Sequence, residues 1–148
     1  MLVGLHLGFA ILGIDGFIWL FGEILARSTH RGRILLSGVL GVAGFALSWL
    51  IGGYYYIKFY GSIVKPIIKA SAVPWAHAIA MEAKEHIFLF IIPMVFTVLF
   101  AALLDVPTLD AAKLRKPLLI LTALVVLVGL SMGVMGFIIS AAARWAAI

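Results

Sequence analysis

Cysteine is absent from the 148 residues of this chain, and charged residues are scarce, at 11%. Without cysteine there can be no disulfide, thiolate nucleophile or cysteine-ligated zinc or iron–sulfur centre, so a bound metal would need His, carboxylate, Met or backbone ligands. The sequence also lacks a Gly-rich phosphate loop, HExxH and GxSxG motifs, and a Ser/His/Asp grouping. Nothing in it therefore supports hydrolase or nucleotide chemistry.

Apolar residues make up most of the chain, at 65%, whereas an ordinary soluble domain carries about 25% charged residues. A hydrocarbon core about 30 Å thick needs about 20 consecutive apolar residues in each spanning helix. The sequence holds four such stretches, which predict helices over 2–26, 34–57, 74–104 and 117–143. We therefore expect an all-α protein, with residues 1–148 forming a single transmembrane domain, an integral membrane four-helix bundle.

The N-terminus runs apolar from Leu2 without a basic region or an obvious small-residue cleavage site, which argues against a removable signal peptide. The formal net charge is +5, but the Lys and Arg residues lie in short loops between apolar stretches. Contact with the lipid bilayer and its anionic headgroups explains this better than nucleic-acid binding does.

The connection between the second and third helices is the longest in the chain. Its first part, 54–60, mixes five aromatic residues with Lys58, as is typical where a helix leaves hydrocarbon for headgroups. The following part, 61–74, interleaves Lys65 and Lys69 with Ile and Val. This pattern predicts an amphipathic interfacial segment lying along the membrane surface.

The distribution of Lys and Arg predicts the orientation of the helices. The first and third loops together carry six such residues and the opposite side five, and the first loop places Arg27, Arg31 and Arg33 within seven residues. Short loops weigh most in the positive-inside rule. We expect a multi-pass protein of the cell membrane with these two loops in the cytoplasm and both termini outside. His30 lies in the first loop and receives no functional role.

Small residues recur at four-residue spacing in the two charge-free helices. Gly44, Ser48 and Gly52 form one stripe, and Gly129 with Gly133 forms another. Such stripes let neighbouring helices approach closely, so packing is the preferred interpretation.

Two histidines near the outer face are candidates for haem ligation. His6 lies near the start of the first helix and His86 in the third, and antiparallel topology places them at similar depth. Imidazoles facing each other across a bundle can hold a haem iron, and Gly4 and Gly8 beside His6 would leave room for a flat macrocycle. The alternative is that both histidines bond to headgroups, water or a neighbouring helix.

His77 competes with His86 for this role, but nine residues separate them, which is about half a turn apart on a straight helix. Glu82 and His86 are spaced i, i+4 and share a face. This pair could hold a divalent metal together with His6, or Glu82 could orient the His86 ring. The alternative is a solvated helix start in which Glu82 complements the helix dipole.

Asp15 is the deepest charge, about 13 Å from His6 along the helix and near mid-membrane. Asp15, Trp19 and Glu23 recur at four-residue spacing, so the two carboxylates share a stripe that points toward the cytoplasm. An ionisable group in the membrane is by default a functional hypothesis, and here it is a proton path. Hydrogen bonding to a packed helix, or contact with a partner subunit, is the alternative.

The segment from Leu5 to Gly16, LHLGFAILGIDG, followed by an apolar stretch and Arg27, resembles the first helix of the copper-resistance D proteins and the HemJ-type protoporphyrinogen oxidases. In those families an early LH dipeptide precedes a small-residue patch, and in haem-binding members the His is an axial ligand. The resemblance covers about one helix of four and implies His6 as a haem ligand. Asp15 departs from it, because that patch is usually neutral.

These observations lead to three hypotheses. The first is a b-type cytochrome-like electron-transfer protein, binding haem b between the first and third helices near the outer face and working with a redox partner; a haem-dependent oxidoreductase is included in it. The second is a non-catalytic accessory subunit of a larger membrane complex, without a cofactor. The third is a metal or proton conduit using a divalent metal or the Asp15 path.

Overall fold

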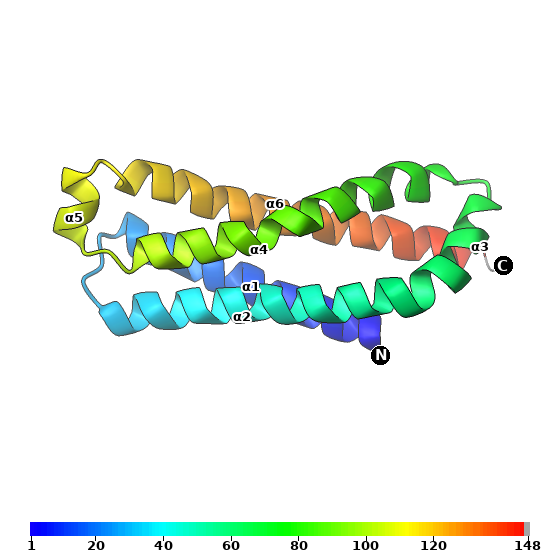
Figure 1. The fold of residues 1–148 in the computed structure, drawn as a ribbon, viewed down its shortest axis with the longest axis horizontal. Helices are drawn as coiled ribbons and strands as arrows, with labels where there is room; N and C mark the ends of the chain where they lie inside the picture. The colour runs from blue at the N-terminus through cyan, green and yellow to red at the C-terminus, as the bar shows by residue number, and fades with distance from the viewer. Residues whose placement is uncertain (147–148) are drawn as a thin grey trace.

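The chain forms a bundle of four long helices in the computed structural model, which describes residues 1–146 (Figure 1). These residues contain no strand, so the expected all-α class is confirmed. The helical elements are α1 (Leu2–Leu25), α2 (Arg31–Tyr55), η1 (Tyr56–Val64), α3 (Lys65–Lys69), η2 (Ala76–Met81), α4 (Glu82–Ala102), α5 (Val106–Ala111) and α6 (Arg115–Trp145), of which η1 and η2 are π-helical.

Four helical stretches of the described chain are long and apolar enough to cross a membrane: Leu2–Leu25, Arg31–Lys69, Ala76–Ala102 and Arg115–Trp145. Their number and order agree with the prediction from hydropathy. The second stretch is longer than expected, because helical hydrogen bonding continues from α2 through η1 and α3 instead of ending near residue 57. Most of the expected interfacial segment 61–74 is thus a helical extension of α2, and its place at a membrane surface stays a prediction.

The two ends of the bundle differ in their connections (Figure 1). At one end lie the N-terminus, η1, α3, η2 and the last turns of α6; this is called the α3 end. At the other lie the α1–α2 turn and α5; this is called the α5 end. Helices α1 and α4 both pack on α2 and on α6. They therefore occupy diagonal positions in the bundle.

Glycines set the close approach of α1 and α2. A Cβ added at Gly16 would lie 2.5 Å from the Gly41 nitrogen, and one at Gly44 would lie 2.4 Å from the Gly13 nitrogen. Since the obstructing atoms belong to the backbone, no side-chain rearrangement relieves the overlap. The predicted packing role of the α2 stripe is therefore confirmed at Gly44.

Large apolar side chains fill the middle of the bundle. The main core cluster includes the completely buried side chains Phe17, Leu20, Val95, Val98 and Val125. A smaller cluster at the α3 end is centred on Tyr60 and Ile68 and includes Ile139 of α6. The two clusters separate the polar groups at the two ends of the bundle.

Helix α1 ends at the α5 end through backbone bonds. Arg27 has a positive φ of 54°, its N–H donates to the Ile24 carbonyl over 3.2 Å, and the Ser28 N–H donates to the Glu23 carbonyl over 3.0 Å. This pair of bonds is the Schellman arrangement that satisfies the last carbonyls of a helix. It reverses the chain so that α2 can return along α1.

Candidate functional site

A buried polar cluster at the α3 end is the candidate site. Its members come from three elements: Tyr60 from η1, His77 from η2, and Glu82 and Glu85 from α4. Two of the three elements are π-helices, which are rare and occur frequently at functional sites. A π-helical turn also changes the register of side chains, so Tyr60 and His77 both point inward although 17 residues separate them.

Tyr60, His77 and Glu82 form a connected chain of polar side chains. Tyr60 is 2% exposed and His77 is 4% exposed. The Tyr60 hydroxyl lies 3.1 Å from Nδ1 of His77, and the opposite ring nitrogen, Nε2, lies 3.6 Å from a Glu82 carboxylate oxygen. Nδ1 of His77 therefore has a hydrogen-bond partner within the protein, and Nε2 faces the Glu82 carboxylate at a distance longer than a direct hydrogen bond.

Two further charged side chains of α4, Lys84 and Glu85, lie at the same end of the bundle. Lys84 is half-buried, and its ammonium lies 3.1 Å from the position a Cβ would take on Gly136 of α6. Oxygen Oε1 of Glu85 is buried, and among the described residues it has no hydrogen-bond partner. Buried polar atoms in proteins are nearly always satisfied. Glu85 is therefore an acceptor at this end of the bundle that the described residues leave without a donor.

His6 lies on α1 and is half-buried against α2. One of its ring nitrogens is hydrogen-bonded to Ser48 of α2. Its Nδ1 is 2.8 Å from the Ser48 carbonyl oxygen and 2.9 Å from the Ser48 hydroxyl oxygen, while that hydroxyl donates to the His6 carbonyl. These acceptors assign the proton to Nδ1. The ring packs on Gly52, where a Cβ would come within 2.7 Å of it. Nε2 is left as the nitrogen with a free lone pair.

His86 is exposed, and its Nδ1 donates to the Glu82 carbonyl oxygen over 2.6 Å. The inward position at this level of α4 belongs instead to Lys84, two residues earlier and therefore about 200° around the helix. His86 thus contacts the backbone of Glu82, four residues earlier, and not its side chain. The Glu82 carboxylate lies near His77 instead. The structure records no contact between His86 and His6.

The remaining residues of the expected haem and metal sites lie elsewhere. Gly4 and Gly8 are exposed, with nothing within 4 Å of an added Cβ. Each is two residues from His6 and so lies on the opposite side of α1. No group of three or more His, Asp or Glu side chains in residues 1–146 is arranged to hold a metal ion.

Asp15 and Glu23 have different surroundings despite their shared stripe. Asp15 is exposed on the outside of α1. Glu23 is 5% exposed, accepts a hydrogen bond from Trp19 over 2.9 Å and pairs with Arg33 at 2.5 Å. The apolar core between Glu23 and the α3 end contains Phe17 and other completely buried apolar residues. The expected proton path therefore gains no support from these contacts.

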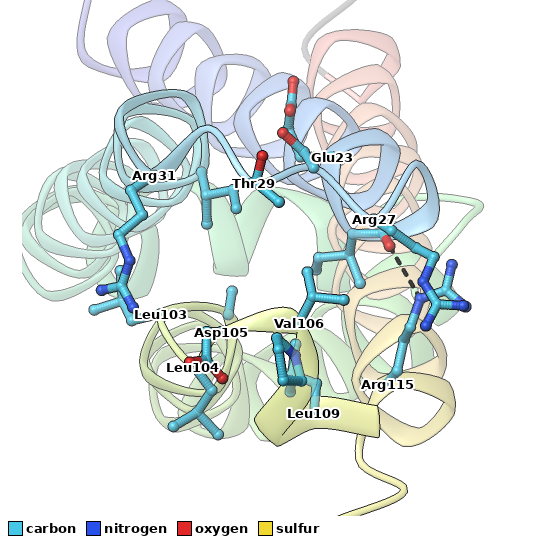
Figure 2. A pocket seen from close by; sticks show the side chains of 15 residues that line it. Glu23, Arg27, Thr29, Arg31, Leu103, Leu104, Asp105, Val106, Leu109 and Arg115 are labelled. Atoms are coloured by element: carbon cyan, nitrogen blue, oxygen red, sulfur yellow. Dashed lines mark hydrogen bonds between the residues drawn. The ribbon is translucent and has the colours of Figure 1, made fainter. Parts of the chain in front are cut away.

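A second polar region lies at the α5 end around a cavity of about 130 Å³, shown in Figure 2. Arg115 donates to the Ile24 and Leu25 carbonyls at the end of α1, and Arg27 pairs with Asp110. The cavity is smaller than the roughly 300–1,000 Å³ of a typical ligand pocket. Because Arg115 links α6 to the end of α1 and Arg27 links the end of α1 to α5, we interpret this region as a structural tie.

Asp105 caps α5 at the rim of this cavity. Its carboxylate accepts a hydrogen bond from the Thr108 backbone N–H over 2.9 Å, and the bonds from Thr108 lower the pKa of Asp105 below its ordinary value. An aspartate at this position satisfies one of the free N–H groups at the start of a helix.

Tyr60 is the member of the cluster that the sequence did not identify, since it reads there as one of several interfacial aromatics. Only the sequence position of His77 and the acidic start of α4 pointed to this region. Comparisons with protein-family models, with curated proteins and with solved structures found no match to this chain.

Proposed function

We propose that the chain is a b-type cytochrome-like electron-transfer protein that binds haem b at the α3 end, with His6 as one axial ligand. The observation that carries this proposal is the hydrogen bond between Nδ1 of His6 and the Ser48 carbonyl oxygen. Histidines that bind metals commonly donate their second ring N–H to a carbonyl, which fixes the tautomer and orients the free nitrogen. His6 has this arrangement, and bound haem would supply one-electron chemistry.

The second axial ligand is proposed to come from α4. His86 has the same tautomer arrangement as His6, because its Nδ1 donates to the Glu82 carbonyl and leaves Nε2 free. Its exposure and the diagonal placement of α1 and α4 weigh against a shared pocket. Lys84 is the competing ligand through its neutral amine, since its side chain is half-buried and reaches Gly136 of α6.

The polar side chains of Tyr60, His77 and Glu82, of which the first two are buried, would then serve proton transfer at the same end of the bundle. A change of charge at a site in a low-dielectric interior is costly unless a proton moves with it. The Tyr60 hydroxyl and the His77 ring can pass that proton toward Glu82, whose side chain is 46% exposed. In the orientation predicted by the loop charges, this end faces the outside of the cell membrane.

The visible spectrum of the protein, purified after expression with haem supplied, tests the proposal. We expect a Soret band that is lost in His6→Ala and kept in His30→Ala, the control at an exposed loop histidine. Loss or a shift of the band in His86→Ala assigns the second ligand to His86. A change in Lys84→Met with an unchanged His86→Ala spectrum assigns it to Lys84. No Soret band in the wild type, or an unchanged band in His6→Ala, refutes the proposal.

A further inference from the structure

Asp15 lies close to the middle of α1, and its side chain is exposed on the outside of the bundle. Helix α1 is one of the four stretches that are long and apolar enough to cross a membrane. Outward exposure at this depth means contact with hydrocarbon, where carboxyl groups are rare and normally face a bundle interior or a partner. No hydrogen bond or ion pair of Asp15 occurs within the described bundle, so a partner must come from outside it.

The face of α1 around Asp15 has the pattern of a helix–helix interface. Six exposed residues recur at alternating spacings of four and three: Gly4, Gly8, Ile11, Asp15, Ile18 and Gly22. This is the seven-residue repeat of a left-handed helix pair. The buried residues of α1, such as Gly13, Phe17 and Leu20, lie on the opposite side. The name "Asp15 face" is used below for these six exposed residues.

The glycines of the Asp15 face are not used by the bundle. A Cβ added at Gly4, Gly8 or Gly22 would meet nothing within 4 Å, in contrast to the crowded Gly13 and Gly16 on the inner side. A shallow groove near the α5 end is lined by Ile18 and Gly22 of this face together with Glu23 and Arg33. Figure 1 shows the N-terminal part of α1 at the margin of the bundle, where a second helix can reach it.

We propose that the Asp15 face binds the same face of a second copy of this chain, so that two α1 helices pair in parallel about a two-fold axis. Copies inserted with the same orientation in one membrane present identical residues at identical depth. Each glycine then meets a glycine, and Asp15 meets Asp15. Two-fold pairing through one self-complementary patch is the commonest form of homo-oligomer.

The chemistry of Asp15 favours a second copy over an unrelated helix. Two facing carboxyl groups that share a proton satisfy each other, because a protonated carboxyl donates and its partner accepts. An unrelated helix would have to supply a donor at the same depth. The glycines on both sides of Asp15 allow the two backbones to approach closely enough for this contact. The interface is independent of haem binding, since His6 points to the opposite side of α1.

Cysteine cross-linking of the full chain in phospholipid vesicles tests this pairing. Because the chain has no cysteine, Ile11→Cys introduces its only thiol, and Phe137→Cys on α6 provides a control that is 75% exposed before substitution. A disulfide requires Cα atoms within about 7 Å. Under mild oxidation we expect the Ile11→Cys dimer to form at least tenfold faster than the Phe137→Cys dimer.

Second substitutions in the Ile11→Cys background distinguish cross-linking within a specific dimer from cross-linking by random collision of two chains. Asp15→Leu and Gly8→Ile should lower the cross-linking rate to that of the control. Asp15→Asn should preserve it, because a carboxamide also donates and accepts, and Gly133→Ile on α6 should leave it unchanged. Gly8, Asp15 and Gly133 are exposed, so the monomer fold is retained, and far-UV circular dichroism checks this.

Three results would overturn the proposal. The first is equal cross-linking of Ile11→Cys and Phe137→Cys. The second is rapid cross-linking that Asp15→Leu leaves unchanged, since the carboxyl would then have no part in the interface. The third is a chain that stays monomeric in the vesicles, with no Ile11→Cys dimer formed under oxidation. A Soret band that persists in Asp15→Leu would show that failure of pairing does not reflect loss of the haem site.

Discussion

Gly16→Ala tests the close contact of α1 and α2 on which the bundle depends. The new Cβ would lie 2.5 Å from the Gly41 nitrogen and 2.6 Å from its Cα. Ordinary contact between such atoms begins at about 3.5 Å, so the two backbones must separate by about 1 Å. Overpacking costs about 1–3 kcal/mol, and an unyielding backbone places this site at the upper end of that range.

The gain in helix propensity on replacing glycine by alanine offsets up to about 1 kcal/mol. We therefore expect Gly16→Ala to lower the free energy of unfolding by about 2 kcal/mol, a factor of about 30 in the unfolding equilibrium constant. Equilibrium unfolding in mixed detergent micelles, followed by tryptophan fluorescence and circular dichroism, measures this change. Both probes should report the same transition if the bundle unfolds cooperatively.

Gly133→Ala is the matched control, because a Cβ at Gly133 meets nothing within 4 Å. It should leave stability unchanged or raise it by a few tenths of a kcal/mol up to about 1 kcal/mol. If Gly16→Ala is as stable as the wild type while Gly133→Ala behaves as expected, the close α1–α2 contact does not contribute to stability, and the reasoning is refuted.

Two further predictions concern the α5 end. Hydrogen bonds from Thr108 lower the pKa of Asp105, so its stabilising effect should be complete above the unfolded aspartate pKa of about 3.9 and be lost as pH falls toward the folded value. The difference in thermal midpoint between wild type and Asp105→Ala should accordingly shrink from pH 7 to pH 3, and a constant difference would contradict the capping role. Glu23→Ala removes the buried acceptor of Trp19 and Arg33 and should destabilise by about 2 kcal/mol in the micelle assay. Arg33→Ala should lower the free energy of unfolding by less than Glu23→Ala does, because the Arg33 side chain is 60% exposed. An equal or larger loss in Arg33→Ala would contradict the view that the buried Glu23 carboxylate is the more important partner.

The number of long helices followed from the sequence because hydropathy is summed over a whole stretch. About 20 apolar residues span a membrane whatever their exact order, so small errors at the helix ends do not change the count. Close packing at Gly44 was also predictable, because the spacing of small residues in one helix suffices to indicate it. The α-helix expected over 34–57 corresponds to α2, which ends at Tyr55, but the sequence did not indicate that helical hydrogen bonding continues through η1 and α3 to Lys69.

The direction in which each polar side chain points was decided by the tertiary structure. Asp15 and Glu23 share a stripe in the sequence, yet Asp15 is exposed and Glu23 is buried against Arg33. Lys84, with no role in the sequence interpretation, takes the inner position on α4, and His86 is exposed.

The physical reason is that a transmembrane helix is apolar on nearly all sides, so its own sequence gives little information about which side its neighbours cover. The side that is covered depends on contacts between helices. Within η1 and η2 it also depends on the rotation from one residue to the next, which differs from that of an α-helix. The sequence by itself determined which segments form helices and which ionisable groups they carry. Only packing determined that Tyr60 meets His77 inside the bundle and that Asp15 faces outward.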